Sequence, residues 1–222
     1  MNVEPSANKA EFKSKKELLV DERREQIVDV AIKLFSEMGY YRTTIEKIAE
    51  AGGFSQGFIY RYFEDKDDLL FHALSVVLNS YETEIPPRLQ GIKHPIDRLC
   101  ATISAFCAVV DSRGQATVLA YRSTRSLTAD RQKPIMAAEE KTNQFLRDGL
   151  DACIRDGYMV QVDEPLMVYQ YLLFSHSWAL KRWAFKDRYT IDEYVSGGLK
   201  LLVKPFLTDQ GLEYWQKYYE ED

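Results

Sequence analysis

A pair of glycines, Gly52-Gly53, separates two short segments that each carry the apolar spacing of a helix. Before the pair, Thr43-Thr44-Ile45-Glu46 has the pattern of a capping box, in which the Thr43 hydroxyl accepts a backbone N–H and the glutamate bonds back to the cap. After the pair, Ser55 can cap a second helix. The sequence therefore predicts helices over about 44–51 and 55–62, joined by a tight turn.

These two segments follow a longer one with an apolar helical stripe from Ile27 to Phe35, and three such helices are typical of a helix-turn-helix domain. The outward residues suit DNA, because hydroxyls bind phosphates, Gln56 can pair bidentately with adenine, and Gly57 permits close backbone approach. Thr44 and Lys66 begin flanking helices, where they can hold phosphates. The alternative is an ordinary helical corner with capping hydroxyls. The predicted DNA contacts are Thr44, Ser55, Gln56, Gly57, Tyr60, Arg61 and Lys66.

The run TTIEKIAEAGGFSQGFIYRYFEDKDDLL, from Thr43 to Leu70, closely resembles the DNA-binding domain of the tetracycline-repressor-like (TetR) family. The likeness covers about residues 23–72. It implies a transcriptional regulator, usually a repressor, that binds a double-stranded DNA operator as a homodimer and releases it when a small molecule binds the C-terminal body. Two positions depart from the family pattern: Phe58 stands where a smaller residue is common, and Gln56 replaces a frequent lysine.

The segment Gly53-Phe54-Ser55-Gln56-Gly57 also matches the G-x-S-x-G motif of α/β-hydrolases, which needs a strand before the nucleophilic serine. A helix is predicted there instead, so a hydrolase that uses Ser55, with His176 as base, is only a remote alternative. His176 is more typical of an interface histidine than of a ligand contact. Because no Walker loop, Rossmann glycine set or metal-spaced Cys/His pair occurs, we expect no enzyme activity, cofactor or metal.

Helical periodicity dominates the rest of the chain, and we expect an all-α fold of about nine helices. The expected organisation is a flexible leader (1–20), a helix-turn-helix DNA-binding domain (21–64), and a connecting helix with a larger ligand-binding and dimerisation domain (65–222). The connecting helix should end near Tyr81, before Pro86-Pro87. The further expected helices cover about 95–111, 115–127, 134–156, 164–186 and 191–208.

Charge and hydropathy limit the compartment and the partners. The formal net charge of −5 lacks the basic excess common in nucleic-acid binders, but acids in caps and on rear faces leave room for a DNA-binding side. The N-terminus has no apolar signal segment, and the longest uncharged stretch, 165–180, is shorter than the roughly 20 residues of a membrane span. Three cysteines in apolar surroundings favour reduced thiols. We therefore expect a cytoplasmic protein that does not bind membranes.

The helix expected over 164–186 pairs an aromatic ring with a guanidinium one turn away. Together with the segment 189–194, this resembles TetR-like regulators that respond to acyl-coenzyme A. The phosphates and adenine of that ligand require cations and an aromatic surface, and its acyl group requires an apolar tunnel. Core packing and a different apolar effector, such as a drug or lipid, are the alternatives. The predicted ligand contacts are Trp178, Arg182, Tyr171, Ser175, Arg122 and Arg125.

The expected helices 164–186 and 191–208 are also the predicted dimer surface. Gly197-Gly198 would let a neighbouring helix approach closely, since glycine within a helix costs roughly 1 kcal/mol relative to alanine and needs a packing reason. The aromatic tail 214–219 could cover either the body or the partner subunit.

Overall fold

The computed structural model describes residues 15–220, and its regular structure in that range is helical apart from one isolated bridge between Met159 and Leu207. The predicted all-α fold is therefore confirmed. Residues 1–14 of the expected leader lie outside the described residues, and the first helix already begins at Lys15, within that leader. The helices are α1 (Lys15–Met38), α2 (Ile45–Gly52), α3 (Gln56–Ile59), α4 (Lys66–Arg88), α5 (Pro95–Ser112), α6 (Gly114–Ser123), α7 (Ala129–Arg155), α8 (Glu164–Leu180), α9 (Arg182–Phe185), α10 (Ile191–Leu202) and α11 (Asp209–Tyr219), with 3₁₀ turns η1 (Thr124–Ser126) and η2 (Lys204–Phe206).

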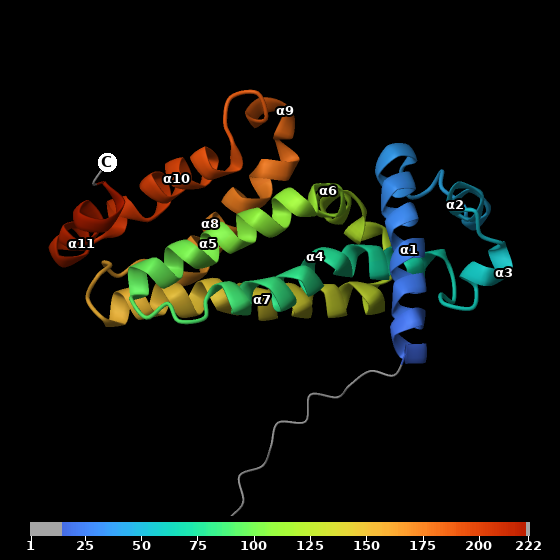
Figure 1. Cartoon of the computed structure of the whole chain (residues 1–222), viewed down its shortest axis with the longest axis horizontal. Coiled ribbons are helices and arrows are strands. Elements are labelled where there is room, and N and C mark those ends of the chain that lie inside the picture. The colour runs from blue at the N-terminus through green and yellow to red at the C-terminus, as the bar shows by residue number, and fades with distance from the viewer. Residues whose placement is uncertain (1–14, 221–222) are drawn as a thin grey trace, which may run out of the picture.

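Three helices, α1, α2 and α3, form a small module at one end of the elongated molecule (Figure 1). Gly39 follows α1 with a φ of 82°, and Gly53 follows α2 with a φ of 67°. These left-handed conformations are easily adopted only by glycine, so the two residues fix where the helices end. Short connections then hold α2 and α3 against each other in the arrangement of a helix-turn-helix.

A side-chain hydroxyl caps the N-terminus of each of the two short helices, α2 and α3. Ser55 caps α3 by accepting from the Phe58 N–H at 3.1 Å, as predicted. The predicted cap of α2 is wrong by one residue, because the Thr44 hydroxyl accepts from the Lys47 N–H at 3.4 Å. Thr43 is instead buried and donates to two carbonyls at the end of α1 and in the following turn. The buried Thr43 side chain therefore stabilises the turn between α1 and α2, while the side chain of Thr44 is exposed to solvent.

Helix α4 runs from the module into the body and continues past the end predicted near Tyr81 (Figure 1). It passes through Pro86-Pro87, which lack the N–H groups that a helix uses. The last turn is nevertheless closed by a hydrogen bond of 3.3 Å from the Leu89 N–H to the Ile85 carbonyl, and both side chains are buried. Burial of the Ile85 and Leu89 side chains therefore stabilises this end of α4, where the two prolines lack backbone N–H donors.

In the body, three expected helices are broken into shorter pieces. The stretch 115–127 consists of α6 and η1, and 191–208 consists of α10 and η2. The expected helix 164–186 ends at Leu180, because Lys181 has a φ of −119° and a ψ of 27°, outside the helical region. In contrast, α7 is longer than expected. It begins at Ala129, five residues before the start predicted at Pro134, and it contains that proline. Eleven α-helices in the described range thus replace the nine expected.

The aromatic tail forms α11 and covers the body of its own chain. Trp215 is buried, and its ring stacks on Tyr219. The hydroxyls of Tyr214 and Tyr219 both donate to the carboxylate of Asp97 on α5, at 2.7 and 2.9 Å. The alternative that the tail covers only a partner subunit is therefore excluded for these three side chains.

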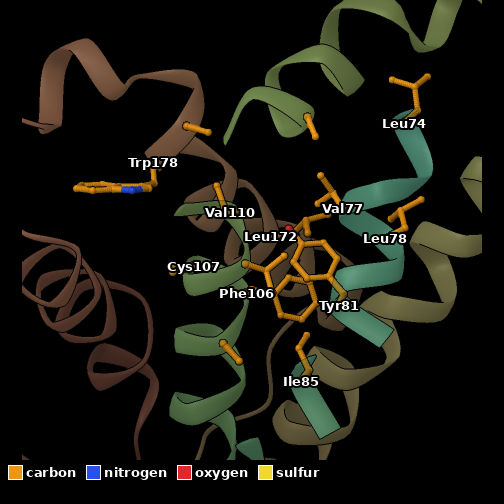
Figure 2. Packing of buried hydrophobic residues seen from close by; sticks show 14 of the residues in the cluster. Leu74, Val77, Leu78, Tyr81, Ile85, Phe106, Cys107, Val110, Leu172 and Trp178 are labelled. Atoms are coloured by element: carbon orange, nitrogen blue, oxygen red, sulfur yellow. The ribbon is translucent and has the colours of Figure 1, made fainter. Parts of the chain in front are cut away.

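The core of the body lies where α4, α5, α7 and α8 pack together. Tyr81 of α4 and Phe106 of α5 contact each other with ring centroids 4.3 Å apart, and Leu172 of α8 lies beside them (Figure 2). Trp178 lies away from this contact, further along α8 (Figure 2). Within residues 15–220, no helix is both long and apolar enough to span a bilayer.

Candidate DNA interface and effector cavity

Six of the seven predicted DNA contacts are exposed on the module, on and around α3. Ile59 points inward and is fully buried, so the opposite side of the helix is left outward. Gly57 has open space where a Cβ would stand, so packing within the chain does not require a glycine there. The exposed members of the predicted set are Thr44, Ser55, Gln56, Gly57, Tyr60 and Arg61.

Phe58, the residue that departs from the family pattern, is half-buried between two other aromatic rings. Its centroid lies 5.4 Å from that of Phe54 and 5.1 Å from that of Tyr62. The Phe58 ring therefore packs against Phe54 in the turn before α3 and against Tyr62 just after α3. A packing role accounts for it without any base contact.

Lys66 differs from the other predicted contacts because its ammonium is already engaged. It donates to the carbonyls of Tyr40 and Thr43, at 3.2 and 3.1 Å, and lies 4.2 Å from the centre of the Tyr40 ring. The Tyr40 hydroxyl in turn donates to Asp67, and burial raises the pKa of that hydroxyl. Lys66 thus fixes the turn that presents Thr44, and a phosphate would have to share its remaining N–H.

A cavity of about 280 Å³, partly open to solvent beside the exposed Tyr121 and Met136, lies between α4, α6, α7 and α8 and is called the inner cavity below. Most of its wall is apolar, and Arg125 is the only member of the predicted ligand set that lines it. The pKa of the Glu139 carboxyl in this wall is raised by burial. Its lining includes Leu74, Val77, Tyr81, Tyr121, Ile135, Glu139, Leu172 and His176.

A chain of three polar groups crosses the wall of this inner cavity. The His176 ring bonds to the hydroxyl of Tyr81 through Nε2, at 2.9 Å, and to that of Tyr121 through Nδ1, at 2.8 Å. Burial lowers the pKa of His176 to about 4, so the ring is neutral near pH 7. A neutral imidazole has one donor and one acceptor nitrogen, so one tyrosine donates to the ring and the other accepts from it. The accepting tyrosine keeps its own proton for another partner.

The four residues predicted to share one ligand-binding face of 164–186 separate into two groups. Tyr171 and Ser175 lie in the core, where the serine donates to the Tyr171 carbonyl at 2.9 Å, and neither residue lines the inner cavity. Trp178 and Arg182 both donate to the same Asp111 oxygen, at 2.7 and 3.2 Å. The guanidinium lies 5.9 Å from the Trp178 ring, although the helix breaks between them.

A second, outer hollow of about 710 Å³ contains the remaining predicted cations, Arg122 and Arg182. It lies between α1 of the module and the part of the body formed by α6 and the end of α8. Lys33 and Arg113, which were not predicted, line the same hollow. The predicted ligand set is therefore divided between the core, the inner cavity and this outer hollow.

Helix α8 also presents an apolar stripe to the outside. Leu166 is 65% exposed, and Tyr169 and Leu173 follow it at helical spacing with more than a third of their surface free. On α10, Leu201 is 74% exposed and Gly197 has open space around it. Exposed apolar residues in this pattern are typical of a helix–helix interface between subunits.

The hydrolase alternative lacks its structural context. Ser55 lies between two helices and its hydroxyl caps α3, and no strand occurs in residues 15–220. His176 is engaged by two tyrosines in the body. Ser55 therefore has neither the strand nor the base that the hydrolase mechanism needs.

A helix-turn-helix module joined by a long helix to a helical body with an internal cavity defines a ligand-responsive transcriptional regulator. The chain belongs to the TetR family: residues 27–73 match the family described as bacterial regulatory proteins, tetR family, and residues 93–185 match the tetracyclin repressor-like C-terminal domain. It is a regulator and not an enzyme, as predicted.

Individual relatives agree with this assignment. The HTH-type transcriptional regulator HbdR of Aromatoleum sp. (strain CIB) is 54% identical over 87% of this chain and 84% of its own. The repressor KstR2 of Mycobacterium tuberculosis (strain ATCC 25618 / H37Rv) is 23% identical over 74% of this chain and 82% of its own. The crystal structure of AibR with isovaleryl coenzyme A and operator DNA has a TM-score of 0.72 at 24% identity, and covers 83% of this chain and 100% of AibR.

Proposed function

We propose that the protein is a homodimeric repressor that binds a palindromic operator and releases it when an acyl-coenzyme A thioester binds the body. The observation that carries the effector proposal is the inner cavity, because an apolar space of about 280 Å³ with a few hydrogen-bonding groups is suited to a short acyl chain or small ring. The AibR structure, whose ligand is isovaleryl coenzyme A, supports a ligand of this class on the same fold.

The operator would be bound by the exposed face of α3. In a dimer with two-fold symmetry, two such helices reach successive major grooves about 34–36 Å apart. Ser55 and Thr44 supply hydroxyls for phosphates, while Gln56 and Tyr60 reach base edges. The apolar stripe of α8 and the open side of α10 support a dimer through these two helices.

The effector would act through the helices that surround the inner cavity. α4 lines that cavity and is also the helix that continues from the DNA-binding module. A ligand that fits the cavity better in one spacing of the two modules shifts the dimer toward that spacing. A coupling of about 1–3 kcal/mol would weaken operator binding roughly 5- to 150-fold.

The second candidate is the same repressor with an apolar effector that lacks phosphates. The neutral His176 and the apolar wall favour it, since the inner cavity by itself demands no anion. Calorimetry separates the two candidates by comparing short-chain coenzyme A thioesters, isovaleryl-coenzyme A among them, with the matching free acids. Equal affinity would remove any role for Arg122, Arg125 and Arg182 in ligand binding.

The DNA-binding proposal is tested by Tyr60→Ala in a gel-shift assay on the upstream region of the gene itself. Tyr60 is 53% exposed, so its loss should abolish operator retention without lowering the melting temperature. Tyr218→Ala is the matched control, because Tyr218 is 57% exposed on α11, at the opposite end of the molecule (Figure 1). Equal retention by the two variants would contradict the assignment of α3.

A further inference from the structure

The outer hollow carries more positive charge than the chain neutralises. Lys33, Arg113, Arg122 and Arg182 line it, against the two carboxylates Asp29 and Asp111. Lys33 and Arg122 are exposed and have no hydrogen-bond or ion-pair partner among the described residues. Within the part of the chain that the structure describes, Arg113 uses only its Nε, which donates to Ser80 at 3.3 Å. Four cations from three helices and one interhelical residue therefore face one space of about 710 Å³.

The backbone adds hydrogen-bond donors to these cations. α6 begins at Gly114 without any side-chain cap, and Gly114, Gln115 and Ala116 of its first turn line the hollow. Uncapped N–H groups at the start of a helix attract anions, and guanidinium groups bind phosphate oxygens in pairs. The cations and the first turn of α6 face the same space.

We propose that the outer hollow is a phosphate-binding site that holds the effector against both the DNA-binding module and the body. Lys33 belongs to α1, whereas Arg113, Arg122 and Arg182 belong to the body. A polyphosphate such as the nucleotide end of coenzyme A would join the two parts directly, instead of acting only through α4. This deepens the proposed function and rests on it for the identity of the ligand.

Asp111 competes with a bound anion for the guanidinium of Arg182. Its Oδ1 accepts from Arg182 at 3.2 Å and from the Trp178 Nε1–H at 2.7 Å. A bound phosphate can take over Arg182, and Asp111 then loses its ion pair but keeps its hydrogen bond from Trp178. Asp111 thereby sets how readily an anion enters the hollow.

The test is calorimetry at low ionic strength with free coenzyme A, and with pantetheine, which lacks the phosphates. Lys33→Gln and Arg122→Gln should each weaken coenzyme A binding about tenfold, the effect of one lost charge-assisted hydrogen bond. Asp111→Asn should strengthen it several-fold, and pantetheine should not bind at the hollow. Lys186→Gln, which removes an exposed charge outside the hollow, is the matched control.

Equal affinities of Lys33→Gln, Arg122→Gln and Lys186→Gln would overturn the site, as would equal binding of pantetheine. The melting temperatures of the variants check folding, since neither Lys33 nor Arg122 has a hydrogen-bond or ion-pair partner to lose within residues 15–220. Failure of the effector proposal gives a different result: coenzyme A binding still depends on Lys33, but no thioester releases the operator. If thioesters release the operator equally well from Lys33→Gln, the repressor proposal stands and the hollow is excluded.

Discussion

Arg131 of α7 donates two hydrogen bonds to the carboxylate of Asp65, the residue that caps α4. Its Nη1 and Nη2 lie 2.6 and 3.3 Å from the two carboxylate oxygens. Asp65 also accepts from the Asp68 N–H at 2.6 Å, so one carboxylate joins α7 to the first turn of α4. Because Ile135 and Glu139, four and eight residues after Arg131, line the inner cavity, this contact lies on the cavity-facing side of α7. It links the cavity wall to the junction between module and body.

Removing this link should cost little stability by itself. A double-mutant cycle of Arg131→Gln and Asp65→Asn should give a coupling energy of about 0.5–1 kcal/mol in urea unfolding, because the pair is bidentate but partly exposed to solvent. The Arg131 guanidinium lowers the pKa of Asp65, so the coupling should fade as acid protonates the carboxylate. A coupling energy of zero at neutral pH would show that the contact does not form in solution.

Acid should destabilise the fold through His176. Burial lowers its pKa from 6.5 to about 4, so between these values the unfolded chain binds a proton that the folded chain excludes. The free energy of unfolding is therefore full above about pH 6.5 and falls toward pH 4, by at most about 1.4 kcal/mol per pH unit from this group. Urea unfolding of the wild type and of His176→Gln across this range measures the difference.

The variant is the necessary comparison, since Glu139 titrates with the opposite sign. Its pKa is raised by burial, so its protonation favours the folded state as pH falls. Identical pH profiles for the wild type and His176→Gln would show that His176 is not buried as a neutral ring.

Substitutions at two neighbouring glycines of α10, Gly197 and Gly198, should affect folding and dimerisation differently. A Cβ on Gly198 would lie 1.9 Å from the Phe174 ring, which stacks on Tyr194, so Gly198→Ala should destabilise the subunit by about 1–3 kcal/mol. A Cβ on Gly197 meets nothing within 4 Å. Gly197→Ala should therefore stabilise an isolated subunit by up to roughly 1 kcal/mol and weaken a dimer that packs on this side of α10.

Analytical ultracentrifugation measures the second effect, with thermal unfolding as the check on the first. If Gly197→Ala leaves the dimer dissociation constant unchanged, the interface does not include this side of α10.

Operator binding should depend only modestly on salt. Arg61 is exposed without a partner among the described residues, but the Lys66 ammonium already bonds to two carbonyls. We expect a slope of log affinity against log salt concentration clearly shallower than the value of about −9 for ten neutralised phosphates. A slope that steep in a chain lacking residues 1–14 would contradict the assigned contacts, while its appearance only in the full chain would implicate Lys9 and Lys13.

Local signals in the sequence predicted the order of the helices in the DNA-binding module and the turn between α2 and α3. Gly53 and Ser55 set the end of one helix and the start of the next through their own backbone and side-chain chemistry. The cap of α2 was misplaced by one residue, because nothing local distinguishes the buried Thr43 from the exposed Thr44. The extension of α4 through Pro86-Pro87 was missed since it depends on packing in the body.

The surroundings of the inner cavity and the outer hollow could be predicted only in part. Trp178 and Arg182 do lie together, yet their common partner Asp111 is 67 and 71 residues away and has no local signature. The same applies to His176, which lies 95 and 55 residues from the tyrosines that it binds. Contacts over such separations are set by the packing of four helices and not by any spacing in the chain.

All three cysteines, Cys100, Cys107 and Cys153, are buried, and burial raises the pKa of each thiol to about 12. A thiol in this state is almost never the reactive thiolate, so the native chain should resist alkylation. A single cysteine introduced at an exposed position of the module would then be the one site that a maleimide modifies. In the proposed dimer, spin labels at that position of each subunit would report the distance between the two α3 helices as a candidate effector is added.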